Sequence, residues 1–235
     1  MINYVKTLFV DFFSTVYPTN CVNCADILVT NEKHLCTSCL LSLPKTDYHL
    51  NPKNTLFTTL SHNPLMINAF CYLHYSQGGI AQNLLHQIKY QNKPELGMYL
   101  GELYGKEILR SNAIQVDFDM VLAVPMHDLK RNKRGYNQSE YIADGLSKAF
   151  NIIAVFDAVI KTVNTESQTK RSKLQRWQNV KNRFHVEMPA VIYNKNVLLV
   201  DDVITTGATI SELCDELTKC GVASITVCSL ASGIK

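Results

Sequence analysis

The segment that most limits the fold is residues 196–219, where an apolar run meets two adjacent acids, a loop of small residues and a helical pattern. The run at 196–200 predicts a buried strand that stops at the acids, and the pattern at about 207–219 predicts a helix. Other apolar runs predict strands at 67–75, 120–124, 155–160 (weaker) and 224–230, with helices at about 80–90, 95–110 and 137–150. Apolar strands separated by helices favour an α/β fold with a mainly parallel sheet covered on both faces.

The composition excludes several protein classes. The chain has 235 residues, and its hydrophobic fraction of 46% is enough for a sizeable core and excludes a disordered or fibrous protein. Only 18% of the residues are charged and the net charge is +3, so we expect any nucleic-acid contact to be local. No run approaches the roughly 18 apolar residues that a membrane span requires.

The first residues form a helical pattern of apolar side chains over 2–17, which Pro18 ends. We expect this helix to pack on the rest of the protein; a helix in a lipid interface is the alternative, although its polar face is poor in Lys and Arg. Asp11 interrupts the apolar stretch and no small-residue cleavage site follows, so we expect no secretory signal. A cytoplasmic location follows, with a peripheral position at the inner membrane as the alternative.

Two CxxC pairs lie near the N-terminus: Cys21 with Cys24, and Cys36 with Cys39. Each pair offers two thiolates, and together they predict a tetrahedral Zn²⁺ site with no open position, which makes the metal structural. Disulfides are the alternative, which a reducing compartment disfavours. His34 is an alternative ligand or a neighbour of the ligands. The remaining cysteines lie in apolar patterns and are expected in the core: Cys71, Cys214, Cys220 and Cys228.

The loop after the two acids has the properties of an anion site. Backbone N–H groups at the start of a helix attract anions, and Gly207 allows a phosphate to approach closely. Thr205, Thr206 and Thr209 add hydroxyl donors, while Asp201 and Asp202 would face a sugar attached to that phosphate. The segment is not a Walker loop, and a simple helix cap would need one acid rather than two.

Two basic segments are further binding candidates. The turn after the strand at 120–124 carries Arg131, Lys133 and Arg134 and can bind pyrophosphate, although a solvated charge run explains it equally well. Residues 168–184 form a polar loop without acids, typical of a lid or a binding loop. The residues there that could contact DNA are Lys170, Arg171, Lys173, Arg176 and Trp177, and Trp177 either stacks on a base or anchors the loop.

The stretch from Val197 to Ile210 resembles the phosphoribosyl pyrophosphate (PRPP) motif of type I phosphoribosyltransferases. The resemblance implies that Asp201 and Asp202 hold the ribose hydroxyls. It also implies that the 5′-phosphate lies on Thr205, Thr206, Gly207, Ala208 and Thr209.

Together with the paired CxxC motif, RGYNQSE at 134–140 and the loop at 168–184, this stretch is similar to the ComF family of competence-associated phosphoribosyltransferase-like proteins. The similarity runs from about Cys21 to the C-terminus. Lys89 also matches a family position, and Tyr136 stands where the family usually has Phe.

The resemblance implies a type I phosphoribosyltransferase-like core with an N-terminal four-cysteine zinc finger and a small hood. We expect residues 1–45 to hold the N-terminal helix and zinc finger and residues 46–235 the phosphoribosyltransferase-like domain, with the hood or linker at 46–115 and the core at 116–235.

The implied function is PRPP binding, with Mg²⁺, in natural transformation, where single-stranded DNA and other competence proteins are the expected partners. Three alternatives stay open. The protein is a phosphoribosyltransferase in which Asp201 and Asp202 stabilise a cationic sugar, a non-catalytic PRPP or nucleotide sensor, or a zinc-ribbon binder of nucleic acid.

Overall fold

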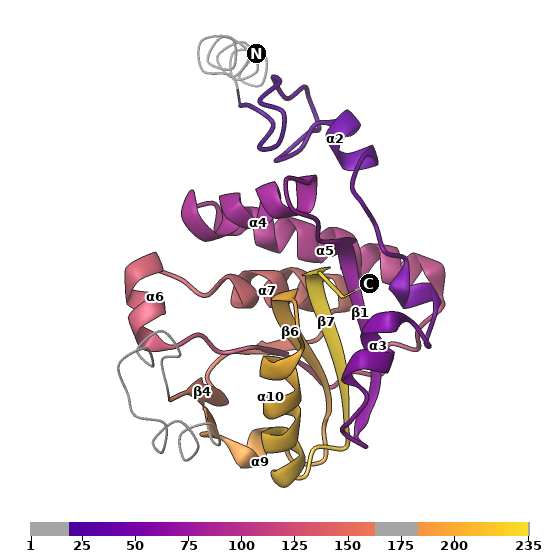
Figure 1. Cartoon of the computed structure of the whole chain (residues 1–235), viewed down its shortest axis with the longest axis vertical. Coiled ribbons are helices and arrows are strands. Elements are labelled where there is room, and N and C mark those ends of the chain that lie inside the picture. The colour runs from indigo at the N-terminus through magenta and orange to yellow at the C-terminus, as the bar shows by residue number, and fades with distance from the viewer. Residues whose placement is uncertain (1–18, 163–182, 235) are drawn as a thin grey trace, which may run out of the picture.

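The computed structural model describes residues 19–162 and 183–234, and its centre is a five-stranded parallel sheet (Figure 1). The strand order is β1 (Met66–His74), β7 (Ser224–Ser232), β6 (Asn196–Ile204), β2 (Met120–Ala123) and β3 (Ile153–Val155). Leu198 of β6 pairs with Val121 of β2 on one side and with Thr226 of β7 on the other. The predicted α/β fold with a mainly parallel sheet is confirmed.

Helices cover both faces of the sheet, and strand β6 shows why. Side chains alternate along a strand, so Leu198 and Val200 face one layer while Val197 and Leu199 face the other. The first layer contains α4 (Ile80–Tyr90), α5 (Pro94–Ser111) and α7 (Gln138–Phe150). The second contains α3 (Thr55–Leu60), α9 (Pro189–Ile192) and α10 (Ala208–Lys219). The core therefore consists of two apolar layers separated by the sheet.

Short elements complete the described chain. The remaining described helices are α2 (Thr37–Leu41), the 3-10 helix η1 (Tyr48–Leu50) and α6 (Asp128–Arg134). Strands β4 (Val159–Lys161) and β5 (Phe184–Val186) form a separate antiparallel ribbon. The N-terminal cysteine segment with α2 lies at the end of the molecule above α4, far from α9 (Figure 1).

Two predicted boundaries are wrong. The single strand expected at 155–160 is two strands, because β3 pairs with β2 whereas β4 pairs with β5. The strand expected at 196–200 does not stop at the acids but continues to Ile204, because β7 supplies pairing partners for Asp201 and Val203. The acids therefore belong to the strand itself, and strand alternation decides which way each of them points.

Helices α5 and α7 pack closely against each other. Glycines lie where the helices meet: a Cβ on Gly145 would overlap the Met98 carbonyl oxygen, and one on Gly101 would overlap the Ile142 carbonyl oxygen.

Within the described ranges, no helix combines the length and the apolar composition needed to cross a bilayer. The expected N-terminal helix at 2–17 lies outside the described residues.

Candidate functional site

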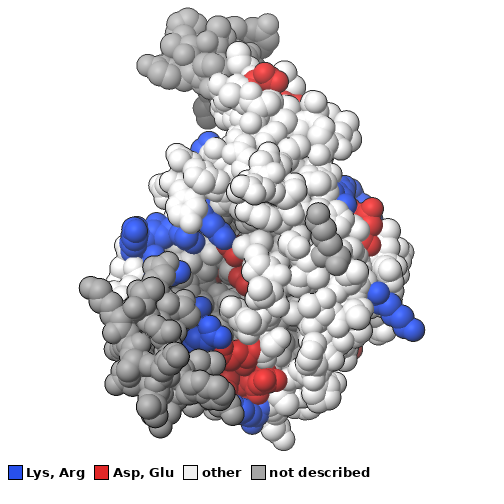
Figure 2. Space-filling view, viewed as in Figure 1, with Lys and Arg blue, Asp and Glu red and all other residues white. Residues whose placement is uncertain are grey.

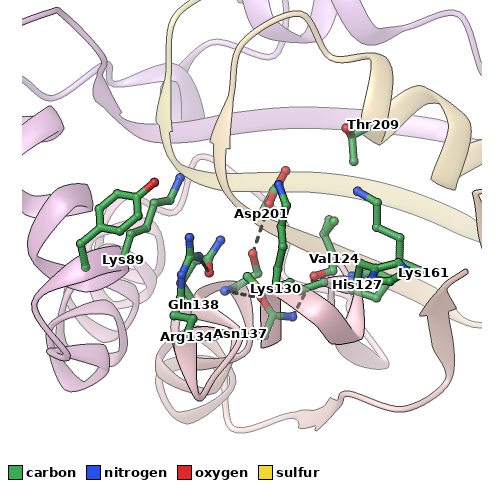
Figure 3. Close-up of a pocket in the computed structure, with 14 residues that line it drawn as sticks. Lys89, Val124, His127, Lys130, Arg134, Asn137, Gln138, Lys161, Asp201 and Thr209 are labelled. Atoms are coloured by element: carbon green, nitrogen blue, oxygen red, sulfur yellow. Dashed lines mark hydrogen bonds between the residues drawn. The ribbon is translucent and has the colours of Figure 1, made fainter. Parts of the chain in front are cut away.

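A cavity of about 280 Å³ opens at the carboxyl ends of β2 and β6 (Figure 3). This is the edge of a parallel α/β sheet where ligands usually bind. Its polar walls come from α4, α6, the start of α7, β4, β6 and α10, through Lys89, Lys130, Arg134, Ser139, Lys161, Asp201 and Thr209. In Figure 3, Asp201 lies between Lys89 and Arg134 on one side and Lys161 on the other. The site thus places one acid among cations.

The wall formed by α6 and α7 depends on three helix caps. His127 caps α6, because its Nδ1 accepts a hydrogen bond from the Leu129 N–H at 3.2 Å. Gly135 ends α6 with φ 89°, a conformation that favours glycine. Asn137 caps α7 by accepting from the Ser139 N–H, and its Nδ2 donates to the Val124 carbonyl at 3.0 Å. The caps hold α7 against β2 and bring its first turn to the cavity.

The two adjacent acids have different surroundings. Asp201 lines the cavity, and its Oδ1 accepts a hydrogen bond from the Ser139 hydroxyl at 3.1 Å. Asp202 is only 4% exposed, and its Oδ2 lies 2.6 Å from the Nζ of Lys89. This difference follows from strand alternation, which directs Asp202 to the layer that contains α4. The pair therefore consists of one acid facing the cavity and one acid in a buried ion pair.

The protonation of Asp201 is shifted by its environment. Burial and the neighbouring charge of Asp202 raise the pKa of Asp201 from 3.8 to about 7. The Asp202 N–H, the Ser139 hydroxyl and Lys89 act in the opposite direction. Burial also lowers the pKa of Lys161, which lines the same cavity. Shifted acids and bases that gather in one cavity are typical of functional sites.

The turn before α10 contains the residues expected to hold a phosphate. Gly207 caps the helix with φ 77°, and a Cβ there would overlap the side chain of Leu60 in α3. Thr209 lines the cavity, whereas Thr205, Thr206 and Ala208 are exposed at the same turn. The first backbone N–H groups of a 12-residue helix therefore lie beside the cavity.

The basic turn divides into two groups. Arg134 lines the cavity, and Lys133 lines an adjoining groove. Arg131 is not in either lining; it is half-exposed and pairs with Glu140 at 3.3 Å. The loop residues expected to contact DNA, among them Lys170, Arg171, Lys173, Arg176 and Trp177, lie outside the described residues.

Sequence reasoning missed some of the residues that line the cavity. Ser139 and Asn137 stand directly after the basic turn, where a helix start was expected, so their capping role was a usable signal. Lys161 gave no comparable signal, because it reaches the cavity through the ribbon of β4 and β5. His127 was visible only as the residue after the strand and its proline.

The four N-terminal cysteines form a cluster that could hold a metal ion. The sulfur atoms of Cys21, Cys24, Cys36 and Cys39 all lie within 4.8 Å of one another. Backbone N–H groups donate to two of these sulfurs, from Cys36 to Cys21 and from Cys39 to Cys36, each at 3.4 Å. His34 is not among the clustered groups; its ring packs against Tyr99 at 5.2 Å between centroids.

A hydrogen-bonded link joins the cysteine cluster to α4. The Nδ2 of Asn23 donates to the sulfur of Cys39 at 3.2 Å, and its Oδ1 accepts from Asn83 of α4 at 3.0 Å. Cys21, Cys36 and Cys39 also belong to the same apolar layer as the buried side chains of α4. Since α4 carries Lys89, the cluster supports the helix that delivers one wall of the cavity.

The Lys89–Asp202 ion pair yields a stability prediction. We expect Lys89→Met to lower the free energy of unfolding by about 3 kcal/mol, because it leaves a buried carboxylate unpaired. The double variant Lys89→Met/Asp202→Asn is expected to recover most of that loss. Urea denaturation measures both. Lys148→Met, which breaks the exposed pair with Asp144, is the control and is expected to cost under about 1 kcal/mol. A double variant no more stable than Lys89→Met would contradict this account.

The raised pKa of Asp201 yields a pH prediction. Because ionisation costs more in the folded than in the unfolded state, Asp201 destabilises the fold above pH 7, and this penalty vanishes as the pH falls towards 4. Asp201→Asn is therefore expected to raise the free energy of unfolding at pH 8 by about 1–3 kcal/mol and to change it little near pH 4. Denaturation at both pH values tests this, with the exposed Asp117→Asn as control. A gain that is equal at the two pH values would be the contrary result.

Comparison with known proteins identifies the domain around the cavity. The family model described as phosphoribosyl transferase domain matches residues 121–235. Among solved structures, glutamine PRPP amidotransferase from B. subtilis is 22% identical with a TM-score of 0.43. That alignment covers 62% of this chain and 30% of the amidotransferase.

Curated relatives match a larger part of the chain. DNA utilization protein YhgH of Escherichia coli K12 is 29% identical over an alignment 208 residues long, which covers 83% of this chain and 83% of YhgH. Competence protein F of Haemophilus influenzae is 27% identical over 222 residues, covering 90% of this chain and 96% of that protein. Both similarities extend beyond the phosphoribosyl transferase domain into the N-terminal part. The chain is therefore a homologue of these ComF-family proteins over most of its length, and its residues 121–235 match the phosphoribosyl transferase domain.

Proposed function

We infer that this protein binds PRPP in the cavity at the sheet edge and acts in natural transformation on single-stranded DNA, with other competence proteins as partners. The observation that carries the inference is the position of Asp201, which lines the cavity between cations and beside the start of α10. A sugar with phosphates at two ends needs this combination: an acceptor for its hydroxyls and anion sites on both sides.

In this proposal each part of PRPP has its own contacts. The 5′-phosphate accepts hydrogen bonds at residues 205–209, where backbone N–H groups begin α10. The ribose hydroxyls donate to Asp201, and the Lys89–Asp202 ion pair borders the same ribose. The pyrophosphate lies towards Arg134, with Arg131 and Lys133 on the same short helix. Mg²⁺, held mainly by the ligand's own phosphates, would neutralise part of their charge.

As an enzyme, the protein would transfer the phosphoribosyl group to an acceptor. The bond from the anomeric carbon to pyrophosphate breaks, and the bond to the acceptor forms. Asp201 stabilises the cationic sugar, while Arg134 and its neighbours stabilise the leaving pyrophosphate. One observation favours the non-catalytic sensor instead: Lys89 already neutralises Asp202, so of the two adjacent acids Asp201 alone is left to stabilise a cation. Release of pyrophosphate from bound PRPP distinguishes the enzyme from the sensor, because a sensor binds PRPP without releasing pyrophosphate.

Calorimetric titration with PRPP and Mg²⁺ tests the binding site. We expect saturable binding to the wild-type protein and roughly 10- to 100-fold weaker binding to Asp201→Asn, because a charged hydrogen-bond acceptor is lost. Asp117→Asn, at the opposite edge of the sheet, is expected to bind like the wild type. If folded wild-type protein produces no heat of binding, the cavity is not a PRPP site.

We propose that residues 1–45 act as a zinc finger and residues 46–235 as the binding domain. A tetrahedral Zn²⁺ with bonds of about 2.3 Å separates its sulfur ligands by about 3.8 Å, which fits four sulfurs that lie within 4.8 Å of one another. The metal would act as a structural support, since four thiolates leave no position for a substrate.

The double variant Cys36→Ser/Cys39→Ser tests the zinc finger. We expect it to lose bound zinc, measured by atomic absorption, and to unfold at a lower temperature, because metal binding and folding are coupled at such sites. Cys220→Ser, which changes a cysteine outside the cluster, is the control. Wild-type protein without zinc, or a double variant with unchanged melting temperature, would exclude a structural zinc site.

A further inference from the structure

A second groove of about 350 Å³ adjoins the cavity. Its walls carry two tyrosines and four cations, namely Tyr90, Tyr136, Lys89, Lys130, Lys133 and Arg134. We call it the Tyr90 groove. Lys89, Tyr90, Lys130 and Arg134 line both the groove and the cavity, so the two spaces lie on either side of the same side chains. Figure 2 shows the Lys and Arg side chains gathered on the α6 side of the molecule, beside a hollow.

Tyr90 is the aromatic surface of this groove. It is the last residue of α4 and is 66% exposed. The guanidinium of Arg134 lies 5.4 Å from the centre of the ring, and the ring of His86 lies 5.1 Å from it. These contacts orient the ring while leaving most of it open. An oriented, exposed ring is a surface on which a base can stack.

Two hydrogen bonds hold the walls of the Tyr90 groove in place. The Tyr136 hydroxyl donates to the Ile88 carbonyl in the last turn of α4, so the turn between α6 and α7 is tied to the helix that carries Tyr90. Arg134 also donates to Gln138, which orients its guanidinium. None of the described residues that line the groove is acidic. An anion that enters therefore meets positive charges at fixed positions, as a phosphate backbone requires.

The geometry points to a single-stranded DNA site in the Tyr90 groove, with a base stacked on Tyr90 and a backbone phosphate on Lys133, which lines the groove but not the cavity. A solvated charge run would explain the cations but not the oriented aromatic ring between them. Duplex DNA fits less well, because its bases are already stacked and cannot reach the ring. The inference rests on the proposed function for its DNA context and deepens it, since it brings the strand to the mouth of the cavity.

Fluorescence anisotropy with a labelled oligothymidylate of about twelve nucleotides tests the site. We expect Tyr90→Ala to weaken binding roughly 5- to 100-fold without changing its dependence on salt, because stacking involves no charge, and Tyr90→Trp to restore it. Lys133→Ala is expected to weaken binding and to lower the salt slope by about one, because one phosphate contact is lost. Duplex DNA of the same length is expected to bind more weakly.

The controls remove equivalent groups elsewhere. Tyr193→Ala deletes a tyrosine that is 67% exposed near α9, and Lys219→Ala deletes one positive charge at the far end of α10. Both are expected to bind the oligonucleotide like the wild type. Equal losses in the controls, or wild-type affinity in Tyr90→Ala, would overturn the inference. PRPP titration is a separate measurement, so oligonucleotide binding that depends on Tyr90 without PRPP binding would reject the proposed function and keep the groove.

Discussion

The ion pair between Lys89 and Asp202 connects the two parts of the structure on which the site depends. It joins α4 to the central strand β6 at the point where β6 passes the cavity. Removing either partner leaves a buried charge, which is far more costly than losing a surface pair. The pair therefore fixes the distance between the helix and the sheet edge, and it leaves Asp201 as the acid that faces the cavity.

Helix α4 is the element through which the other features reach the site. Its Asn83 is hydrogen-bonded to Asn23 of the cysteine cluster, its Lys89 pairs with β6, and its Tyr90 lines the groove and the cavity. This arrangement gives the N-terminal cluster a physical connection to the binding site. A metal bound there would stabilise α4 at one end, and a ligand in the cavity would contact it at the other.

Much of this architecture could be predicted from the sequence, because apolar periodicity reports on burial. The helices at 80–90 and 207–219 and the strand at 67–75 lie within one residue of their predicted bounds. The end of β6 could not be predicted, because Asp201 and Val203 are strand residues only through pairing with β7. The division at 155–160 likewise depends on which strand each half meets.

The site itself was predictable in part. The acids and the turn before α10 stood out as a local pattern, and Arg134 followed from the basic turn. That Asp202 faces α4 follows from strand alternation once the strand is known to include the acids. Its partner Lys89 is far away in sequence, and Lys161 reaches the cavity through a ribbon whose pairing no local pattern reveals. Contacts of this kind need the assembled fold.

A crystal structure of the protein with PRPP and Mg²⁺ tests the central claim most directly. The account predicts ribose beside Asp201, the 5′-phosphate at residues 205–209 and the pyrophosphate next to Arg134, with the Lys89–Asp202 pair intact. A ligand bound elsewhere, or a 5′-phosphate held by the cations of the Tyr90 groove with the turn before α10 empty, would contradict it.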